Sequence, residues 1–212
     1  EEKRAPEPAR VLFGQMATDV WQTIRSRPGW SGILICLSPV GTAVAINLFS
    51  GIAVDYHAPD SLVTYVNGLG NALLTALGAY IGGILCDVLN RRVAYALAGG
   101  LTALCGIGMM LAPMTPLTYA VGASVYMVIT GFCYAAFYAF VLEIVGSQKG
   151  RAASTRYTLF TAAANAAIFY VTRLDGMGYE HFKNSTGFWN GPRGLLAVDA
   201  AANIIGIVLL VG

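Results

Sequence analysis

Long stretches without a charged residue dominate this sequence. Residues 28–54, 61–86, 93–142 and 157–172 contain no Asp, Glu, Lys or Arg. A helix that crosses a bilayer needs about 20 consecutive apolar residues, and charged side chains inside the bilayer are costly. Only 11% of the 212 residues are charged, against about a quarter in soluble domains. The chain is therefore predicted to be an integral membrane protein in contact with a lipid bilayer.

The apolar runs divide into six predicted spans. The run 93–142 is too long for one span, and Pro113 and Pro116 divide it because prolines break helices. A last apolar segment contains only Arg193 and Asp199 as charged residues. The fold class is thus all-α, a six-transmembrane-helix bundle with spans at 31–54, 61–86, 93–112, 117–144, 156–174 and 192–212.

The N-terminal region has a different character. Residues 1–8 are charged and contain prolines, as is typical of a solvated linker. Within 9–29, apolar residues such as Phe13, Met16 and Val20 recur at three- and four-residue spacing. This pattern predicts an amphipathic helix in the membrane interface. Since the chain lacks an initiator Met, we expect it to be part of a longer polypeptide or to be trimmed at its start.

The basic residues lie mostly on one predicted side of the membrane. If the N-terminus is cytoplasmic, ten of the 13 basic residues are cytoplasmic, and only Arg173, Lys183 and Arg193 lie elsewhere. This distribution satisfies the positive-inside rule and places the predicted loop 175–191 outside, with both ends cytoplasmic. The net charge of +2 is too small to indicate a nucleic-acid partner.

The predicted turn between the second and third spans carries a specific motif. Residues 83–92 read G-x-L-x-D-x-x-x-R-R, which resembles the signature loop of the major facilitator superfamily. Val88 stands where that loop usually has Arg, and Asn90 stands where it has Gly, a tolerable change because Asn also adopts left-handed turns. These departures are similar to the second copy of the loop in the C-terminal half of such transporters.

The resemblance implies a role for the loop in gating. Asp87 would cap a neighbouring helix, while Arg91 and Arg92 would hold the cytoplasmic face. Alternatively, these residues only end a helix and set the topology. The resemblance extends from the interfacial helix to the last residue and implies spans seven to twelve of a twelve-helix transporter. Its partner would be an N-terminal six-helix half that is absent from this sequence.

A second resemblance concerns the end of the fourth span and the fifth. Residues 142–146, 152–160 and 174–176, together with Asn165, resemble AmpG-type muropeptide permeases, which carry a similar A-x-T-[KQ]-Y-A-L segment. Arg156 here replaces Lys or Gln, and Thr158 replaces Ala. This resemblance implies a proton-coupled symporter or permease of the bacterial inner membrane, with a muropeptide or another small amphipathic solute as substrate.

Polar residues on the predicted spans are the candidates for a transport pathway. In the second span, six small or polar residues share one helix face, which either packs against another helix or lines a cavity. Asp199 is costly inside a span, so it faces a partner, water or a proton path, or else is a hydrated residue near the interface. The candidates for substrate binding or proton coupling are Asn47, Asn71, Thr75, Tyr126, Thr130, Tyr134, Asn165, Asp199 and Asn203.

Glu143 and Arg156 face each other across a short predicted cytoplasmic loop. They either form a structural salt bridge or take part in gating, as do Asp87, Arg91 and Arg92.

Three functional classes are compatible with a membrane bundle: a secondary transporter, a membrane-embedded enzyme, and a scaffold or receptor. The sequence has no H-E-x-x-H or G-x-S-x-G motif, so no enzyme is expected. His57 and His181 stand alone, so no metal or cofactor is expected. Polar faces on several spans favour a proton-coupled transporter for a small molecule. A scaffold, or a carrier for an unrelated sugar, drug or organic anion, is the alternative.

Overall fold

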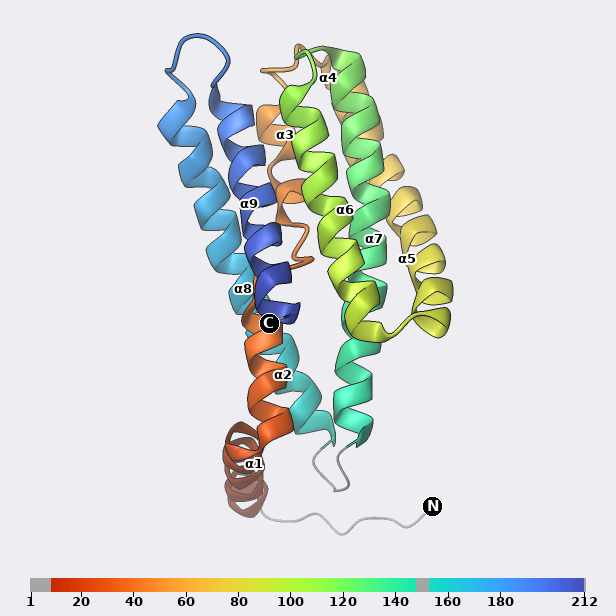
Figure 1. Cartoon of the computed structure of the whole chain (residues 1–212), viewed down its shortest axis with the longest axis vertical. Helices are drawn as coiled ribbons and strands as arrows, with labels where there is room; N and C mark the ends of the chain where they lie inside the picture. The colour runs from red at the N-terminus through yellow and green to blue at the C-terminus, as the bar shows by residue number, and fades with distance from the viewer. Residues whose placement is uncertain (1–8, 148–152, 212) are drawn as a thin grey trace.

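The computed structural model describes residues 9–147 and 153–211, and the predicted linker 1–8 lies outside them. All regular structure in the described residues is helical (Figure 1). In chain order the elements are α1 (Ala9–Arg25), α2 (Arg27–Leu37), the 3-10 helix η1 (Val44–Asn47), α3 (Phe49–Ile52), α4 (Asp60–Tyr65), the π-helix η2 (Val66–Gly70), α5 (Asn71–Val88), α6 (Arg91–Leu111), α7 (Pro116–Ser147), α8 (Ala153–Phe182) and α9 (Gly191–Val211).

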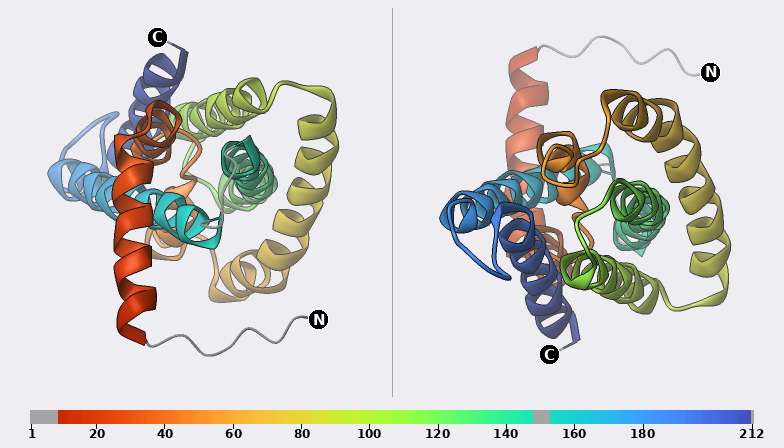
Figure 2. Two further views of the ribbon diagram at one scale, coloured as in Figure 1. Left: turned by 90° about the horizontal axis from the view of Figure 1, so that it is seen from below. Right: turned by 90° about the horizontal axis from the view of Figure 1, so that it is seen from above.

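The long helices form a bundle in which α7 packs against α5 and α6, while α9 packs against α6 and α8 (Figures 1 and 2). Glycines allow α5 and α7 to approach closely. A Cβ atom on Gly78 would lie 1.8 Å from the carbonyl oxygen of Val128, and one on Gly131 would lie 2.0 Å from that of Thr75. This part of the small-residue face of α5 therefore serves helix packing.

Four helices of the described chain are long and apolar enough to cross a membrane. They are Asp60–Val88, Arg91–Leu111, Pro116–Gly146 and Gly191–Leu210. They overlie four of the six predicted spans, and they support an integral membrane protein. The count of six spans remains a prediction.

The first predicted span, 31–54, is not a continuous helix. It consists of α2, an irregular stretch at 38–43, η1 and α3. Pro39 disfavours helical geometry at Ser38, and Gly41 and Ala43 have left-handed φ angles of 63° and 50°. The charge-free run 28–54 does not reveal this break, because the irregular stretch contains no charged residue.

The fifth predicted span ends at 174, but α8 continues to Phe182. The prediction of a loop over 175–191 is therefore wrong in its first part. Buried positions continue through Val171, Asp175 and Gly178, so the same face of the helix still packs against the bundle beyond the apolar run.

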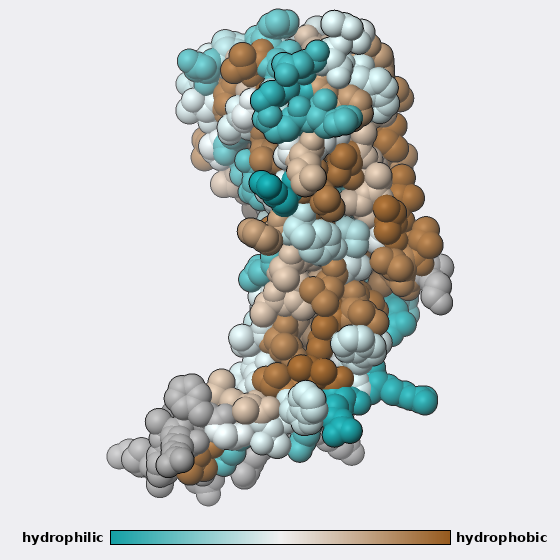
Figure 3. All heavy atoms as spheres, turned by 90° about the vertical axis from the view of Figure 1, so that its left-hand side faces the viewer, coloured by the Kyte–Doolittle hydropathy of each residue, from teal (hydrophilic) through white to brown (hydrophobic). Residues whose placement is uncertain are grey.

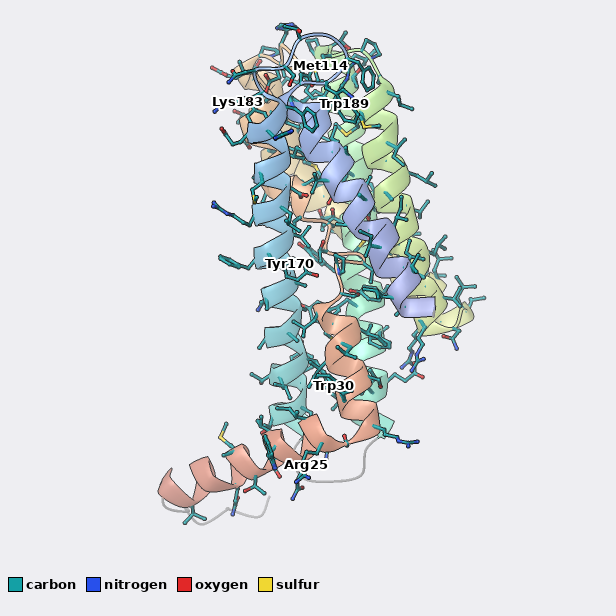
Figure 4. All side chains as sticks on the ribbon, turned by 60° about the vertical axis from the view of Figure 1, so that its left-hand side comes forward. Arg25, Trp30, Met114, Tyr170, Lys183 and Trp189 are labelled. Atoms are coloured by element: carbon teal, nitrogen blue, oxygen red, sulfur yellow. The ribbon has the colours of Figure 1, made fainter. Side chains whose placement is uncertain are left out.

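Helix α1 lies crosswise below the bundle (Figure 2). Figure 4 labels Arg25 at its junction with α2, where the Ser26 side chain accepts a hydrogen bond from the Gly29 N–H and caps α2. Met16 and Trp21 of α1 are exposed. The crosswise position suits the predicted interfacial helix, whose contact with lipid remains a prediction.

The two ends of the molecule differ in polarity. On the side formed by α8 and α9, hydrophilic residues gather at the upper end, and hydrophobic residues cover much of the surface below (Figure 3). Met114, Lys183 and Trp189 mark the upper end in Figure 4, and the Asn190 amide contacts the Met114 sulfur at 3.2 Å.

Candidate functional site

A buried carboxylate stands in the interior of the bundle. Asp199 of α9 is fully buried, and its Oδ2 accepts a hydrogen bond of 3.0 Å from the Tyr126 hydroxyl of α7. The Thr130 hydroxyl donates to the Tyr126 carbonyl at 2.8 Å. Asp199 Oδ1 has no hydrogen-bond partner among the described residues. One carboxylate oxygen is thus held by a phenol, and the other is unsatisfied.

A second buried carboxylate, Asp175 of α8, lies close enough to Asp199 to interact with it electrostatically. Asp175 is also fully buried, and neither of its carboxylate oxygens has a hydrogen-bond partner in the described part of the chain. Neither aspartate forms an ion pair with a described basic residue. We call Asp175 and Asp199 the carboxylate pair.

Glycines bring the two helices of the carboxylate pair together. A Cβ atom on Gly178 of α8 would lie 2.7 Å from the carbonyl oxygen of Gly194 of α9. The two helices touch through their backbones here, with Asp175 three residues before Gly178 and Asp199 five residues after Gly194. Gly106 of α6 leaves room on the other side, where its Cβ atom would lie 3.8 Å from Asp199 Oδ2.

The irregular stretch 38–43 lies next to this centre and is almost fully buried. The Gly41 N–H donates to Asn203 Oδ1 at 2.9 Å, and the Asn203 amide donates to the Asp199 carbonyl at 2.9 Å. The Tyr95 hydroxyl donates to the Val40 carbonyl at 2.8 Å. Non-helical backbone at membrane depth is tolerated only where such partners satisfy it.

Two further contacts hold this stretch. The hydroxyl of Tyr170, labelled in Figure 4, donates to the Leu37 carbonyl at 2.7 Å, where α2 ends. Gly206 of α9 allows the stretch to approach, since its Cβ atom would lie 2.4 Å from the Val40 nitrogen. Residues on the neighbouring helices α8 and α9 thus accommodate the interruption of the first span.

A groove of about 1080 Å³ runs along α8. Its other wall includes Leu48, Gly51 and Ile52 of the η1–α3 region. At one end, the Tyr179 hydroxyl donates to Asp55 Oδ2 at 3.1 Å. Burial raises the pKa of Tyr179, and the nearby Asp55 carboxylate raises it further, so the phenol stays a neutral donor.

A small cavity of about 60 Å³ lies between α7 and α8, lined in part by Tyr134, Tyr138, Thr161 and Asn165. Asn165 also lines the groove along α8. The two hollows therefore share a polar residue.

The predicted binding residues fall into four separate places. Tyr126, Thr130, Asp199 and Asn203 lie together in the buried centre, and Asp199 lines neither of the two hollows. Tyr134 and Asn165 line the small cavity. Asn47 is exposed at the end of η1, and on α5 the Thr75 hydroxyl donates to Asn71 Oδ1 at 3.0 Å.

Two of the predicted gating residues, Arg91 and Glu143, contact each other. Arg91 Nε lies 3.5 Å from Glu143 Oε2, and the guanidinium also donates to the Ala139 carbonyl at 3.4 Å. Glu143 thus pairs with Arg91 in this structure, and its predicted pairing with Arg156 stays a prediction. Asp87 and Arg92 are exposed at the same turn.

The backbone of this turn differs from the expectation. Asn90 has a φ of −58°, so it does not adopt a left-handed turn. Its side chain instead accepts a hydrogen bond of 3.0 Å from the Arg92 N–H and caps α6. Asn suits this position because it is among the preferred N-cap residues.

Asp175 belongs to the segment 174–176 used for the resemblance, but it is not among the predicted binding or gating residues. The signal for it is the periodicity of α8, whose buried positions follow three- and four-residue steps: Phe160, Ala163, Ala167, Val171, Asp175 and Gly178. A carboxylate on the continuous inner face of a helix is a candidate functional group. Because the predicted fifth span ends at 174, Asp175 falls in the predicted loop and is not considered as a site residue.

Comparison with known proteins identifies one family. The family model described as Major Facilitator Superfamily matches residues 1–169 of the 212. Searches of the curated proteins and of the solved structures give no match. The matched segment ends within α8, so the carboxylate pair lies beyond it.

Proposed function

The chain belongs to the major facilitator superfamily, a family of transporters. We propose that it carries a small amphipathic solute across a bilayer and that this transport is coupled to proton movement. The observation that carries the coupling is the buried carboxylate pair with its tyrosine.

The transport cycle that we propose is alternating access. The described helices form one bundle, which would rock against a second six-helix half around a central substrate. The Arg91–Glu143 contact and Asp87 lie at one turn of the bundle and would hold one of the two states. Both ends of the chain would be cytoplasmic, in a bacterial inner membrane.

Proton coupling follows from the cost of two buried charges. Asp175 and Asp199 interact electrostatically, and no described basic residue forms an ion pair with either one. Like charges at one buried site are unfavourable, and desolvation adds to that cost. A proton on one carboxylate removes one charge and supplies a donor for an unsatisfied oxygen. Loading and release of this proton would link the conformations.

For the solute we propose a muropeptide as the first compound to test. The proposal is supported by the likeness of residues 152–160 to the corresponding segment of muropeptide permeases and by an amphipathic groove beside that helix. A sugar that carries a peptide combines apolar, polar and charged parts, as the groove does.

Counterflow in proteoliposomes tests this function. Vesicles that contain the full-length protein and unlabelled muropeptide are expected to take up labelled muropeptide saturably, and a proton gradient is expected to accelerate net uptake. Absence of saturable exchange would favour a scaffold, and exchange of only an unrelated sugar, drug or organic anion would favour a different carrier.

The coupling is tested by Asp199→Asn and Asp175→Asn. Each variant removes one charge at constant volume, so we expect counterflow exchange to continue while the acceleration of net uptake by the proton gradient is lost. Asp60→Asn is the matched control, because Asp60 is exposed in the first turn of α4. Unchanged gradient dependence in both pair variants, at equal expression, would contradict proton coupling by this site.

A further inference from the structure

The groove along α8 contains a cationic side chain whose role is not explained by helix packing. We propose that Arg173 binds the anionic group of an amphipathic carboxylate in this groove. The proposal rests on the proposed function, since it names the substrate class of the transporter.

The groove follows one continuous face of α8. The lining residues from this helix run from Asn165 to Met177 at alternating steps of three and one, and continue with Tyr179 and Glu180. At a rise of 1.5 Å per residue this face is about 22 Å long. A ligand in the groove would therefore contact a single helix face over its length, opposite the wall formed by Leu48 and Ile52.

Arg173 lies well inside this face. It precedes the end of α8 at Phe182 by nine residues, or about 13 Å along the axis. A guanidinium placed against hydrocarbon is costly, so this exposed side of α8 is expected to border water, protein or a polar ligand.

Within the described part of the chain, Arg173 has no hydrogen bond and no ion pair. Two neighbouring basic residues are engaged. Arg193 donates to the Met110 carbonyl at 2.9 Å and stacks on the ring of Phe188, and Lys183 pairs with Glu180. Arg173 thus presents an uncommitted guanidinium to the groove.

The surroundings of Arg173 suit a carboxylate attached to an apolar group. A guanidinium binds carboxylate with two parallel hydrogen bonds. Phe169 and Met177 flank it one turn away on the same face and are exposed, so they offer apolar contact. Glu180 lies about two turns further along and disfavours a second anionic group at that end. The preferred solute therefore has one anionic end and a neutral or basic end.

Binding to the purified full-length protein in phosphatidylcholine nanodiscs tests this proposal. The probes are N-acetylmuramoyl-L-alanyl-D-isoglutamine and N-octanoylglycine, each compared by calorimetry with its amide, which lacks the charge. We expect saturable binding of at least one carboxylate and binding at least tenfold weaker for its amide. Equal affinities within both pairs, or no saturable binding of either carboxylate, would overturn the proposal.

Variants assign the preference to Arg173. Arg173→Gln is expected to weaken carboxylate binding about tenfold to a hundredfold and to leave amide binding unchanged, because a charge-assisted hydrogen bond is lost. Arg173→Lys keeps the charge, so we expect it to lose less affinity for the carboxylate than Arg173→Gln does. Arg27→Gln is the matched control, since it removes an exposed positive charge outside the groove. A loss with Arg27→Gln equal to that with Arg173→Gln would overturn the assignment.

The reactivity of a cysteine in the groove shows whether the groove is open to a solute or covered by a protein helix. Met177→Cys is expected to react with a water-soluble maleimide, and the bound carboxylate is expected to slow that reaction. A cysteine that stays unreactive would show that protein covers the groove and would overturn the proposal. Counterflow distinguishes the two proposals: exchange with unaltered anion preference in Arg173→Gln refutes the groove site alone, whereas anion binding without any exchange refutes transport alone.

Discussion

Gly178 of α8 and Gly194 of α9 meet backbone to backbone, since a Cβ atom on Gly194 would lie only 2.3 Å from the Gly178 carbonyl oxygen. This contact sets how closely the two helices cross, and therefore how near Asp175 and Asp199 lie to each other. The spacing of the two aspartates therefore depends on the contact between the two glycines.

We expect Gly194→Ala to destabilise the protein. The added methyl group meets backbone that cannot yield without separating the helices, and overpacking of this kind costs about 1 to 3 kcal/mol. Thermal unfolding in detergent measures the loss. Gly176→Ala on α8 is the control, because nothing lies within 4 Å of its Cβ position, and it should be neutral or stabilising. Equal stability of Gly194→Ala and the wild type would show that the helices do not cross as described.

The Tyr126–Asp199 hydrogen bond should appear as a coupling energy. Tyr126→Phe keeps the edge-on ring contact with Phe49, at 5.0 Å between centroids, but removes the donor. A cycle of Tyr126→Phe and Asp199→Asn should give a coupling of about 0.5 to 3 kcal/mol in the free energy of unfolding. Tyr134→Phe, at an exposed tyrosine of the same helix, should show no coupling to Asp199→Asn. Additive effects of the first pair would mean that the two side chains do not interact.

The sequence predicts the long helices well where an apolar composition alone requires a helix. The charge-free runs 61–86 and 93–142 coincide with long helices, because a bilayer demands continuous apolar surface and satisfied backbone. The break at 38–43 escapes the same reasoning, since it depends on Pro39 and Gly41 together with partners on α6 and α9 that only the folded bundle supplies.

The candidate site shows a similar division. Polar residues inside apolar runs, such as Tyr126 and Asp199, are visible in the sequence, but the bond between them joins positions 73 residues apart and depends on packing. Asp175 is not predicted as a site residue because Arg173 and Asp175 end the charge-free run, so the predicted span stops at 174, although the inner face of α8 continues past both. Arg173 counts in the sequence as one external charge, and only the groove gives it a possible ligand.

Asn203 should hold the irregular stretch in place. Asn203→Ala removes the acceptor of the Gly41 N–H, and an unpaired buried donor costs about 1 to 3 kcal/mol. Hydrogen exchange at the Gly41 amide should therefore accelerate. Asn184→Ala removes an exposed amide outside both hollows and should leave the exchange at Gly41 unchanged. Protection of Gly41 that is equal in Asn203→Ala and the wild type would contradict the assigned contact.

The topology can be decided by labelling two exposed asparagines. Asn184 follows α8, and Asn90 lies in the turn before α6, so the expected orientation places them on opposite sides of the membrane. The four native cysteines are buried or half-buried, so an introduced cysteine should react faster than they do. With right-side-out vesicles, an impermeant maleimide should label Asn184→Cys, whereas Asn90→Cys should react only after permeabilisation. The positive-inside rule supplies the reason, because Arg91 and Arg92 flank Asn90. Labelling of Asn90→Cys in intact vesicles, with Asn184→Cys protected, would reverse the orientation, and labelling of both would mean that the intervening helices do not cross the bilayer an odd number of times.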